Sequence, residues 1–256
     1  MVTKKEMSET PTYGNWVAKK IIYLLGLISL VFFGLSFLSP VLVILAIVFL
    51  FICSYFIYAW YLFAPQGGNV QNQIHDLLLA QLQWNGEGQT LDIGCGNAAL
   101  TIRLAHKYPH ARFMGIDYWG NKWEFSKHIC EKNAQIEGVQ DRVTFEKASA
   151  SALPFPDGSF DAVVSNLVFH EVRDAKDKKK VLHEALRVVK NGGTFAFQDL
   201  FLMKCLYGDI DDLLKTIRSW GINQVEFIPT RDATFIPRAL KLPFMVGTMG
   251  IIAGKK

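Results

Sequence analysis

One aspartate and two glycines carry the first chemical signal in the sequence. Gly94 and Gly96 follow the apolar stretch LDI, and Asp92 stands two residues before the first glycine. Glycines at this place let the backbone turn sharply and approach a ligand, because no Cβ intervenes. The stretch from Gly94 to Ala99 also satisfies the dinucleotide fingerprint GxGxxA. The glycines alone therefore leave a dinucleotide and other nucleotide-like cofactors open.

The negative charge of Asp92 favours a cationic cofactor over a dinucleotide. A dinucleotide would place its pyrophosphate at this loop, and two like charges about 4 Å apart repel by about 4 kcal/mol at an effective dielectric of about 20. S-adenosylmethionine instead carries an ammonium and a sulfonium, which a carboxylate attracts. Asp117 ends the next apolar stretch, where an acid can accept hydrogen bonds from both ribose hydroxyls. A simple strand-end cap is the alternative role for Asp117.

Four segments in fixed order, LDIGCG, GIDYW, ALPFPDGSFDAVVSN and NGGTFAFQD, resemble the motif series of class I S-adenosylmethionine-dependent methyltransferases of the methyltransferase-11/25 kind. The resemblance extends from about Val70 to Lys256. It implies an α/β, Rossmann-like methyltransferase sheet of seven strands, whose last strand is formed by the C-terminus and runs antiparallel. It also implies S-adenosyl-L-methionine as the cofactor and methyl transfer as the reaction.

The resemblance further assigns roles to individual residues. At two positions the chain departs from the family: relatives often have a glycine where Ala98 stands and an acid where Ser149 stands. We expect Ala98 only to narrow the loop, and we expect the Ser149 hydroxyl to accept a hydrogen bond from adenine more weakly than an acid. The residues expected to bind the cofactor are Asp92, Gly94, Cys95 and Gly96 in the loop, Asp117 at the ribose, Tyr118 and Trp119 beside the adenine, and Ser149, Ala150 and Asn166.

Catalytic candidates follow two later apolar stretches. His170 is expected to take a proton from the acceptor, with Glu171 or Asp174 orienting it, and Asp199 is a second candidate. The alternatives are that His170 packs or caps the next helix and that Asp199 caps a turn. Cys95 is interpreted as a small loop residue, because no paired base is evident near it in the sequence.

The elements that must position these residues alternate between strand and helix patterns, which predicts a parallel sheet with helices on both faces. A helix is expected within 70–84, and a C-terminal cap for the helix at 174–190 is expected at Asn191–Gly193. The predicted strands are 89–93, 111–117, 142–148, 160–166, 193–199, 224–229 and 246–253, and the further predicted helices are 98–108, 120–137 and 209–218.

Upstream of this region lies an apolar segment, Ile21 to Phe63, without a charged residue or histidine. Its two parts, 21–39 and 41–63, are each long enough to cross a hydrocarbon core of about 30 Å. Pro40 separates them because proline disfavours a continuing helix. We therefore expect a two-helix transmembrane hairpin. A buried hairpin in a soluble core is the alternative, and a cleaved signal peptide is disfavoured by the length of the segment.

The flanks of the hairpin predict its orientation. Lys4, Lys5, Lys19 and Lys20 precede it, and tyrosine and tryptophan gather at its two ends. The positive-inside rule then predicts a cytoplasmic tail (1–20), the hairpin (21–64) and a methyltransferase domain (65–256) that faces the cytoplasm from the cell membrane. The expected partners are the lipid bilayer and an apolar or lipid-like small-molecule substrate.

Composition excludes several other classes of function. The net charge of +4 comes without a basic stripe, so no nucleic-acid partner is expected, and four scattered cysteines predict neither a metal site nor disulfides. The leading hypothesis is methyl transfer to a membrane-associated or apolar acceptor, with Arg231–Gly247 at the bilayer surface as a substrate cover. The alternatives are an ordinary packed connection for that segment, a tethered enzyme with a soluble or protein acceptor, a non-catalytic cofactor-binding module, and a dehydrogenase.

Overall fold

The computed structural model describes residues 10–120 and 125–256. These residues form two compact units. The first comprises the described residues up to Gly14, those in His75–Ala233 and Leu242–Lys256, and it contains the sheet. The second comprises Asn15–Ile74 and Thr234–Lys241 and contains the apolar helices. The domain boundaries expected from the sequence stay a prediction.

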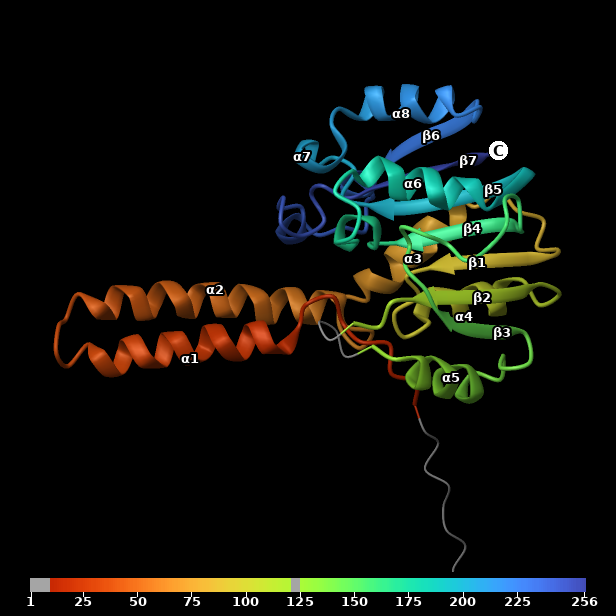
Figure 1. Cartoon of the computed structure of the whole chain (residues 1–256). Coiled ribbons are helices and arrows are strands. Elements are labelled where there is room, and N and C mark those ends of the chain that lie inside the picture. The colour runs from red at the N-terminus through yellow and green to blue at the C-terminus, as the bar shows by residue number, and fades with distance from the viewer. Residues whose placement is uncertain (1–9, 121–124) are drawn as a thin grey trace, which may run out of the picture. The chain divides into compact units, whose positions relative to one another are not determined.

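Seven strands form one sheet in the order β3-β2-β1-β4-β5-β7-β6 (Figure 1). Strands β1 to β5 are paired in parallel, and β7 is antiparallel to both β5 and β6. The expected α/β methyltransferase sheet with its antiparallel last strand is therefore confirmed. The strands are β1 (Gln89–Ile93), β2 (Arg112–Asp117), β3 (Val143–Lys147), β4 (Phe160–Asn166), β5 (Val189–Asp199), β6 (Gln224–Pro229) and β7 (Gly250–Lys255).

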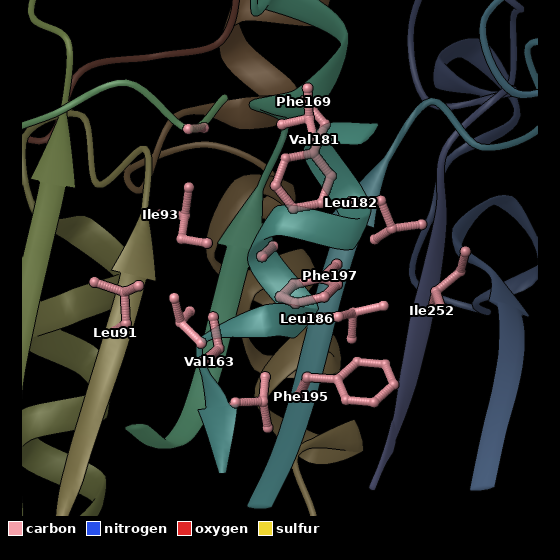
Figure 2. Close-up of a cluster of buried hydrophobic side chains, with 14 of the residues drawn as sticks. Leu91, Ile93, Val163, Phe169, Val181, Leu182, Leu186, Phe195, Phe197 and Ile252 are labelled. Carbon is pink, nitrogen blue, oxygen red and sulfur yellow. The ribbon is translucent and has the colours of Figure 1, made fainter. Parts of the chain in front are cut away.

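Alternate residues of the central strands build separate cores on the two faces of the sheet. On one face Leu91, Val163 and Phe197 pack with residues of α6 and α8 (Figure 2). On the other face Val164 and Ala196 pack with residues of α3, α4 and α5. The helices are α3 (Val70–Gln81), α4 (Ala99–Lys107), α5 (Lys127–Ile136), α6 (Lys178–Arg187), α7 (Lys204–Tyr207) and α8 (Ile210–Ser219), with short 3-10 turns η1 (Phe169–Glu171), η2 (Thr230–Asp232) and η3 (Arg238–Leu240).

Side-chain caps explain where several helices begin. Ser126, Asp177 and Asp209 each accept a hydrogen bond from a backbone N–H in the first turn of α5, α6 and α8. The helix expected to begin at Gly120 therefore begins at Lys127 among the described residues, and the helix expected to begin at Asp174 begins at Lys178.

The predicted C-terminal cap at Asn191–Gly193 is wrong. Helix α6 ends at Arg187, and these residues belong to β5. The pairing of β5 with β4 shifts register between Phe160 and Ala162, because four residues of β5 bulge out before Thr194. Glycines signal both helix ends and bulges, which explains the misinterpretation. Strand β7 also begins later than predicted, at Gly250 instead of Val246.

The second unit contains an antiparallel pair of helices, α1 (Lys19–Leu35) and α2 (Leu42–Phe63), shown in red and orange in Figure 1. The expected break at Ser39–Pro40 lies in the turn between them. Large apolar side chains are exposed along both helices, and Phe37 and Leu38 at the turn are 88% and 82% exposed. Among the described residues, α2 alone is long and apolar enough to count as a candidate membrane span, since α1 has 17 residues.

Candidate active site

The loop after β1 folds against the neighbouring strand β2. The backbone N–H groups of Gly94 and Cys95 both donate to the Ile116 carbonyl, at 2.7 and 2.9 Å. Gly94 has a φ of +74°, and a Cβ there would lie 2.1 Å from a methyl carbon of Val168. This position therefore requires glycine for both conformational and steric reasons.

Ala98 does more than narrow this loop, which corrects the sequence expectation. It has a φ of +68° and immediately precedes α4. The left-handed conformation costs a residue with a Cβ about 1–2 kcal/mol. A glycine at this position would avoid the strain. Among the described residues, four non-glycine residues have positive φ, and three of them, Ala98, Trp119 and Leu167, follow β1, β2 and β4. Backbone strain of this kind clusters at functional sites.

Asp92 lies beneath the loop and is 2% exposed. The hydroxyl of Thr101, on α4, donates to its carboxylate at 2.5 Å. Burial raises the pKa of Asp92 to about 7, although the hydrogen bonds from Thr101 act in the opposite direction. A cationic ligand group placed beside this carboxyl would favour its ionised form. Thr101 is a site residue that the sequence reasoning missed.

Asp117 connects the loops that follow β1 and β2. Its carboxylate accepts hydrogen bonds from the backbone N–H of Gly96 at 3.0 Å and of Trp119 at 2.7 Å. The indole N–H of Trp119 in turn donates to the Gly96 carbonyl at 3.0 Å. Burial raises the pKa of Asp117, against the effect of these backbone hydrogen bonds. A carboxylate has about four acceptor positions, and those that the backbone leaves open can receive ribose hydroxyls.

The residues expected beside the adenine differ in their environments. Tyr118 is 66% exposed, with the Lys147 ammonium 5.1 Å from its ring centre. Ala150 is buried, whereas Ser149 donates a hydrogen bond to Asp174 at 3.0 Å. A carboxylate thus lies beside Ser149 after all, supplied by Asp174 from a different loop. Spacing in the sequence gave no signal for this pairing.

The catalytic candidates lie together after β4 and β5. The Nδ1 of His170 is 2.7 Å from a carboxylate oxygen of Asp199, and the backbone N–H of His170 donates to the other oxygen. Because a carboxylate only accepts, Nδ1 carries the proton and Nε2 is left to act as a base. Asp199 therefore orients His170. Glu171 is 3.9 Å from Nε2, and Asp174 binds serines instead of His170.

Asp199 also changes the basicity of His170. Burial alone would lower the pKa of His170, but the hydrogen bond from its ring to Asp199 and the charge of that carboxylate outweigh burial and raise the pKa above its ordinary value. Asp199 itself is fully buried. The pair resembles the acid-oriented histidines that serve as general bases in many enzymes.

Cys95 is placed as a packing residue of the loop. Its side chain is buried, and burial raises the pKa of its thiol, so the thiolate is disfavoured. The neighbouring Cys130 thiol, on α5, donates to the Gly96 carbonyl at 3.1 Å. Neither environment is that of a reactive nucleophile.

A contact that sequence reasoning missed connects the loop to the N-terminal segment. The side-chain amide of Asn133, on α5, donates to the carbonyls of Asn97 and Thr12, at 2.9 and 3.0 Å. The Thr12 N–H donates back to Asn133 at 2.8 Å. Asn133 is 1% exposed, so these bonds are shielded from water.

These residues fit S-adenosylmethionine. Asn166, at the end of β4, has a buried side-chain oxygen without a hydrogen-bond partner among the described residues. Such an oxygen can accept from a ligand donor, and a buried acceptor left unpaired costs about 1–3 kcal/mol. Asp92 disfavours a pyrophosphate at the loop, whereas Asp117 can receive the ribose of either cofactor. The charge of Asp92 therefore makes these acceptors suit a cationic nucleoside better than a dinucleotide.

Residues 91–197 match the family model of a methyltransferase domain. The matched region contains the β1 loop, Asp117, Asn166 and His170, and it ends two residues before Asp199.

Several curated relatives are named as methyltransferases. The chain is 34% identical over 131 residues to 27-O-demethylrifamycin SV methyltransferase of Amycolatopsis mediterranei, covering 51% of this chain and 45% of that protein. It is 36% identical over 103 residues to demethylmenaquinone methyltransferase of Thermus thermophilus, covering 40% and 43%. The chain thus spans less than half the length of either relative.

Among solved structures, geranyl diphosphate C-methyltransferase from Streptomyces coelicolor, in complex with S-adenosyl-L-homocysteine, has a TM-score of 0.56 at 13% identity. The superposition covers 73% of this chain and 80% of that chain. This likeness shows the fold. The family match and the relatives together indicate a methyltransferase domain in residues 91–197.

Proposed function

We propose that this chain is an S-adenosyl-L-methionine-dependent methyltransferase that acts on an apolar small molecule associated with the membrane. One observation carries the proposal: Asp92 and Asp117 bracket the Gly94–Gly96 loop within the matched domain. Asp92 attracts the cationic end of the cofactor, and Asp117 both fixes the loop and receives the ribose. Asn166 accepts from the cofactor at the end of β4.

Methyl transfer to this acceptor places two demands on the residues. When bound, the cofactor supplies an electrophilic methyl carbon whose bond to sulfur breaks, with the electron pair staying on sulfur, as the acceptor forms its bond to that carbon. The protein must position the acceptor, which can contribute up to about 7–11 kcal/mol. It must also remove a proton when the acceptor is a hydroxyl or an acidic carbon.

His170 meets the second demand in this proposal. Its Nε2 takes the proton of the acceptor, and the positive charge formed on the ring is stabilised by Asp199 at Nδ1. Because Asp199 is buried, its interaction with the imidazolium is weakly screened by solvent. Glu171, 3.9 Å from Nε2, adds a second negative charge.

The apolar hairpin supports a membrane-associated acceptor. Both helices expose large aliphatic and aromatic side chains, including Leu30 at 69% and Phe51 at 72%. Contiguous exposed apolar surface on this scale is characteristic of contact with lipid or a partner. We propose that the hairpin inserts into the cell membrane from the cytoplasmic face and keeps the methyltransferase unit in the cytoplasm. The similar protein of Thermus thermophilus is named for demethylmenaquinone, an apolar acceptor, which supports an acceptor of this class.

The acceptor class is tested by labelling. The full-length chain, reconstituted in vesicles, is incubated with methyl-labelled S-adenosylmethionine and a cell extract, which is then separated into lipid-soluble, small water-soluble and protein fractions. The proposal expects the label in the lipid-soluble fraction. Label in the water-soluble or protein fraction would instead establish a tethered enzyme with a soluble acceptor. Cofactor binding without label in any fraction would establish a non-catalytic module.

A further inference from the structure

The second unit carries all of the formal net charge of the protein. Its basic residues are Lys19, Lys20, Arg238 and Lys241, and it contains no Asp or Glu. Removing these four from the 27 basic residues of the chain leaves 23, which equals the number of acidic residues. An apolar unit that carries four basic residues and no acidic residue of its own has a net positive charge, which suits it to an anionic surface.

The contacts between α1 and α2 show how far along the hairpin the lysines lie. Asn15 bonds the Trp60 carbonyl, the Cys53 thiol bonds the Ile22 carbonyl and Ser29 bonds the Ala46 carbonyl, at 3.0, 3.5 and 2.8 Å. The residue numbers of each pair add to the same value, so the helices run antiparallel in a constant register.

This register places Lys19 and Lys20 level with Phe56 and Tyr55 of α2. The Lys19 ammonium also lies 5.3 Å from the centre of the Trp60 ring. Tyrosine and tryptophan prefer the level of the lipid headgroups.

The two other cations are held at the same level. The Tyr55 hydroxyl donates a hydrogen bond to the Ala239 carbonyl at 2.9 Å, within the short turn η3. Ile236 and Leu240 on either side of Ala239 are buried, whereas Arg238 and Lys241 are exposed. The segment Thr234–Lys241 thus presents its charged side chains outward beside the part of α2 that faces Lys20.

We propose that Lys19, Lys20, Arg238 and Lys241 form a basic collar that binds the anionic headgroups of bilayer lipids where the hairpin enters the membrane. The inference rests on the proposed insertion of the hairpin and deepens it by naming the lipid class. The collar lies where the apolar side chains of Ile21 and beyond begin, so its cations reach the headgroup phosphates while the hairpin remains in hydrocarbon. Each cation at such a surface increases lipid affinity by up to about fivefold.

Quenching of tryptophan fluorescence by brominated lipids tests the collar. The full-length chain is reconstituted in vesicles with brominated phosphatidylglycerol or brominated phosphatidylcholine, and the tryptophans of the second unit, Trp16 and Trp60, report which lipid lies beside the hairpin. The wild type is expected to prefer the anionic lipid, and Arg238→Gln/Lys241→Gln is expected to lose most of that preference. Arg238→Lys should retain it, and salt should weaken it.

The matched control removes two charges from another exposed site. Lys176→Gln/Lys180→Gln, in the charged run before and within α6, should leave the lipid preference unchanged. Two results overturn the collar but not the insertion of the hairpin. One is equal quenching by both lipids, and the other is an equal loss of the preference for the anionic lipid in the control variant. Absence of quenching by either lipid overturns the insertion itself, and with it the collar.

Discussion

At the scale of a single residue, the ionised Asp92 carboxylate lowers the stability of the fold but favours binding of the cofactor. Its carboxyl is buried, and Thr101 is its one side-chain donor among the described residues, so burial penalises the ionised form. The same carboxylate is the group that attracts the cofactor. The sequence identified Asp92 as decisive from its position alone, but its burial and its partner depend on how α4 packs against β1, which spacing does not reveal.

Asp92→Asn should separate these effects. The pKa of Asp92 is raised to about 7 from 3.8, so the native state holds the proton more tightly and this group lowers stability as pH rises from about 4 to about 7. At pH 8 the variant should unfold at an equal or higher temperature, with a gain of at most about 4 kcal/mol, and the gain should vanish at pH 4. Thermal unfolding at both pH values measures it. If the stability of the variant relative to the wild type is lower at pH 8 than at pH 4, then burial does not penalise the ionised form of Asp92.

Ala98→Gly should stabilise the protein. Glycine relieves the strain of the left-handed backbone at this position, where φ is +68°. Part of the gain is offset by the greater freedom of glycine in the unfolded chain, so we expect about 0.5–1 kcal/mol. Denaturant unfolding measures the change, with Ala105→Gly inside α4 as the matched control that should destabilise. Destabilisation by both substitutions would show that strain at Ala98 is unimportant.

Asp199→Asn should weaken catalysis and move its pH dependence. The Asp199 carboxylate raises the pKa of His170, and the base must be neutral to accept a proton, so activity should rise as pH passes this raised pKa. In the variant the rising limb should move to lower pH, and kcat should fall by about 100-fold or more. The pH dependence of kcat measures both. An unmoved limb would mean that His170 does not act as the base.

The elements divide into those that local sequence specifies and those that it does not. Buried strands such as β1 and β4 coincide with their predicted residues because each is a short stretch with β-branched or aromatic residues, bounded by glycine or other turn residues. The end of α6 was misplaced because Asn191–Gly193 forms a bulge against β4, a tertiary feature. The pairing of His170 with Asp199 likewise depends on the adjacency of β4 and β5, although both residues were identified from the sequence.

The lengths of α1 and α2 predict how deeply the hairpin reaches. From Lys20 to the end of α1 at Leu35 the helix rises about 22 Å, less than a hydrocarbon core of about 30 Å. The turn with the exposed Phe37 and Leu38 should therefore remain in hydrocarbon instead of reaching the opposite aqueous phase, in contrast to the two complete spans expected from the sequence.

Cysteine labelling tests this depth. In Ser39→Cys the new thiol at the turn should resist a membrane-impermeant maleimide applied to either face of sealed vesicles and should react once detergent is added. Cys205, which is exposed in the methyltransferase unit, is the internal control for access from one face. Labelling of position 39 from the face opposite to Cys205 would show that the hairpin crosses completely.

At the scale of the whole molecule, one chain combines a methyltransferase domain with an apolar hairpin that the sheet does not require. The charges are divided accordingly: the sheet unit has equal numbers of acids and bases, and the hairpin unit has only bases. Composition and hydropathy revealed this division. The attachment of Thr234–Lys241 to α2 through Tyr55 was beyond the sequence, because a hydrogen bond between residues so distant in the chain has no local pattern.

The measurement that most directly tests the account is calorimetric titration of the full-length chain with S-adenosylmethionine and, separately, with a nicotinamide dinucleotide. The account predicts binding of S-adenosylmethionine alone, with affinity reduced by about 10-fold or more in Asp92→Asn, since a hydrogen bond to a charged group contributes about 1.5–3 kcal/mol. Binding of the dinucleotide, or S-adenosylmethionine binding that is unchanged in Asp92→Asn, would contradict it.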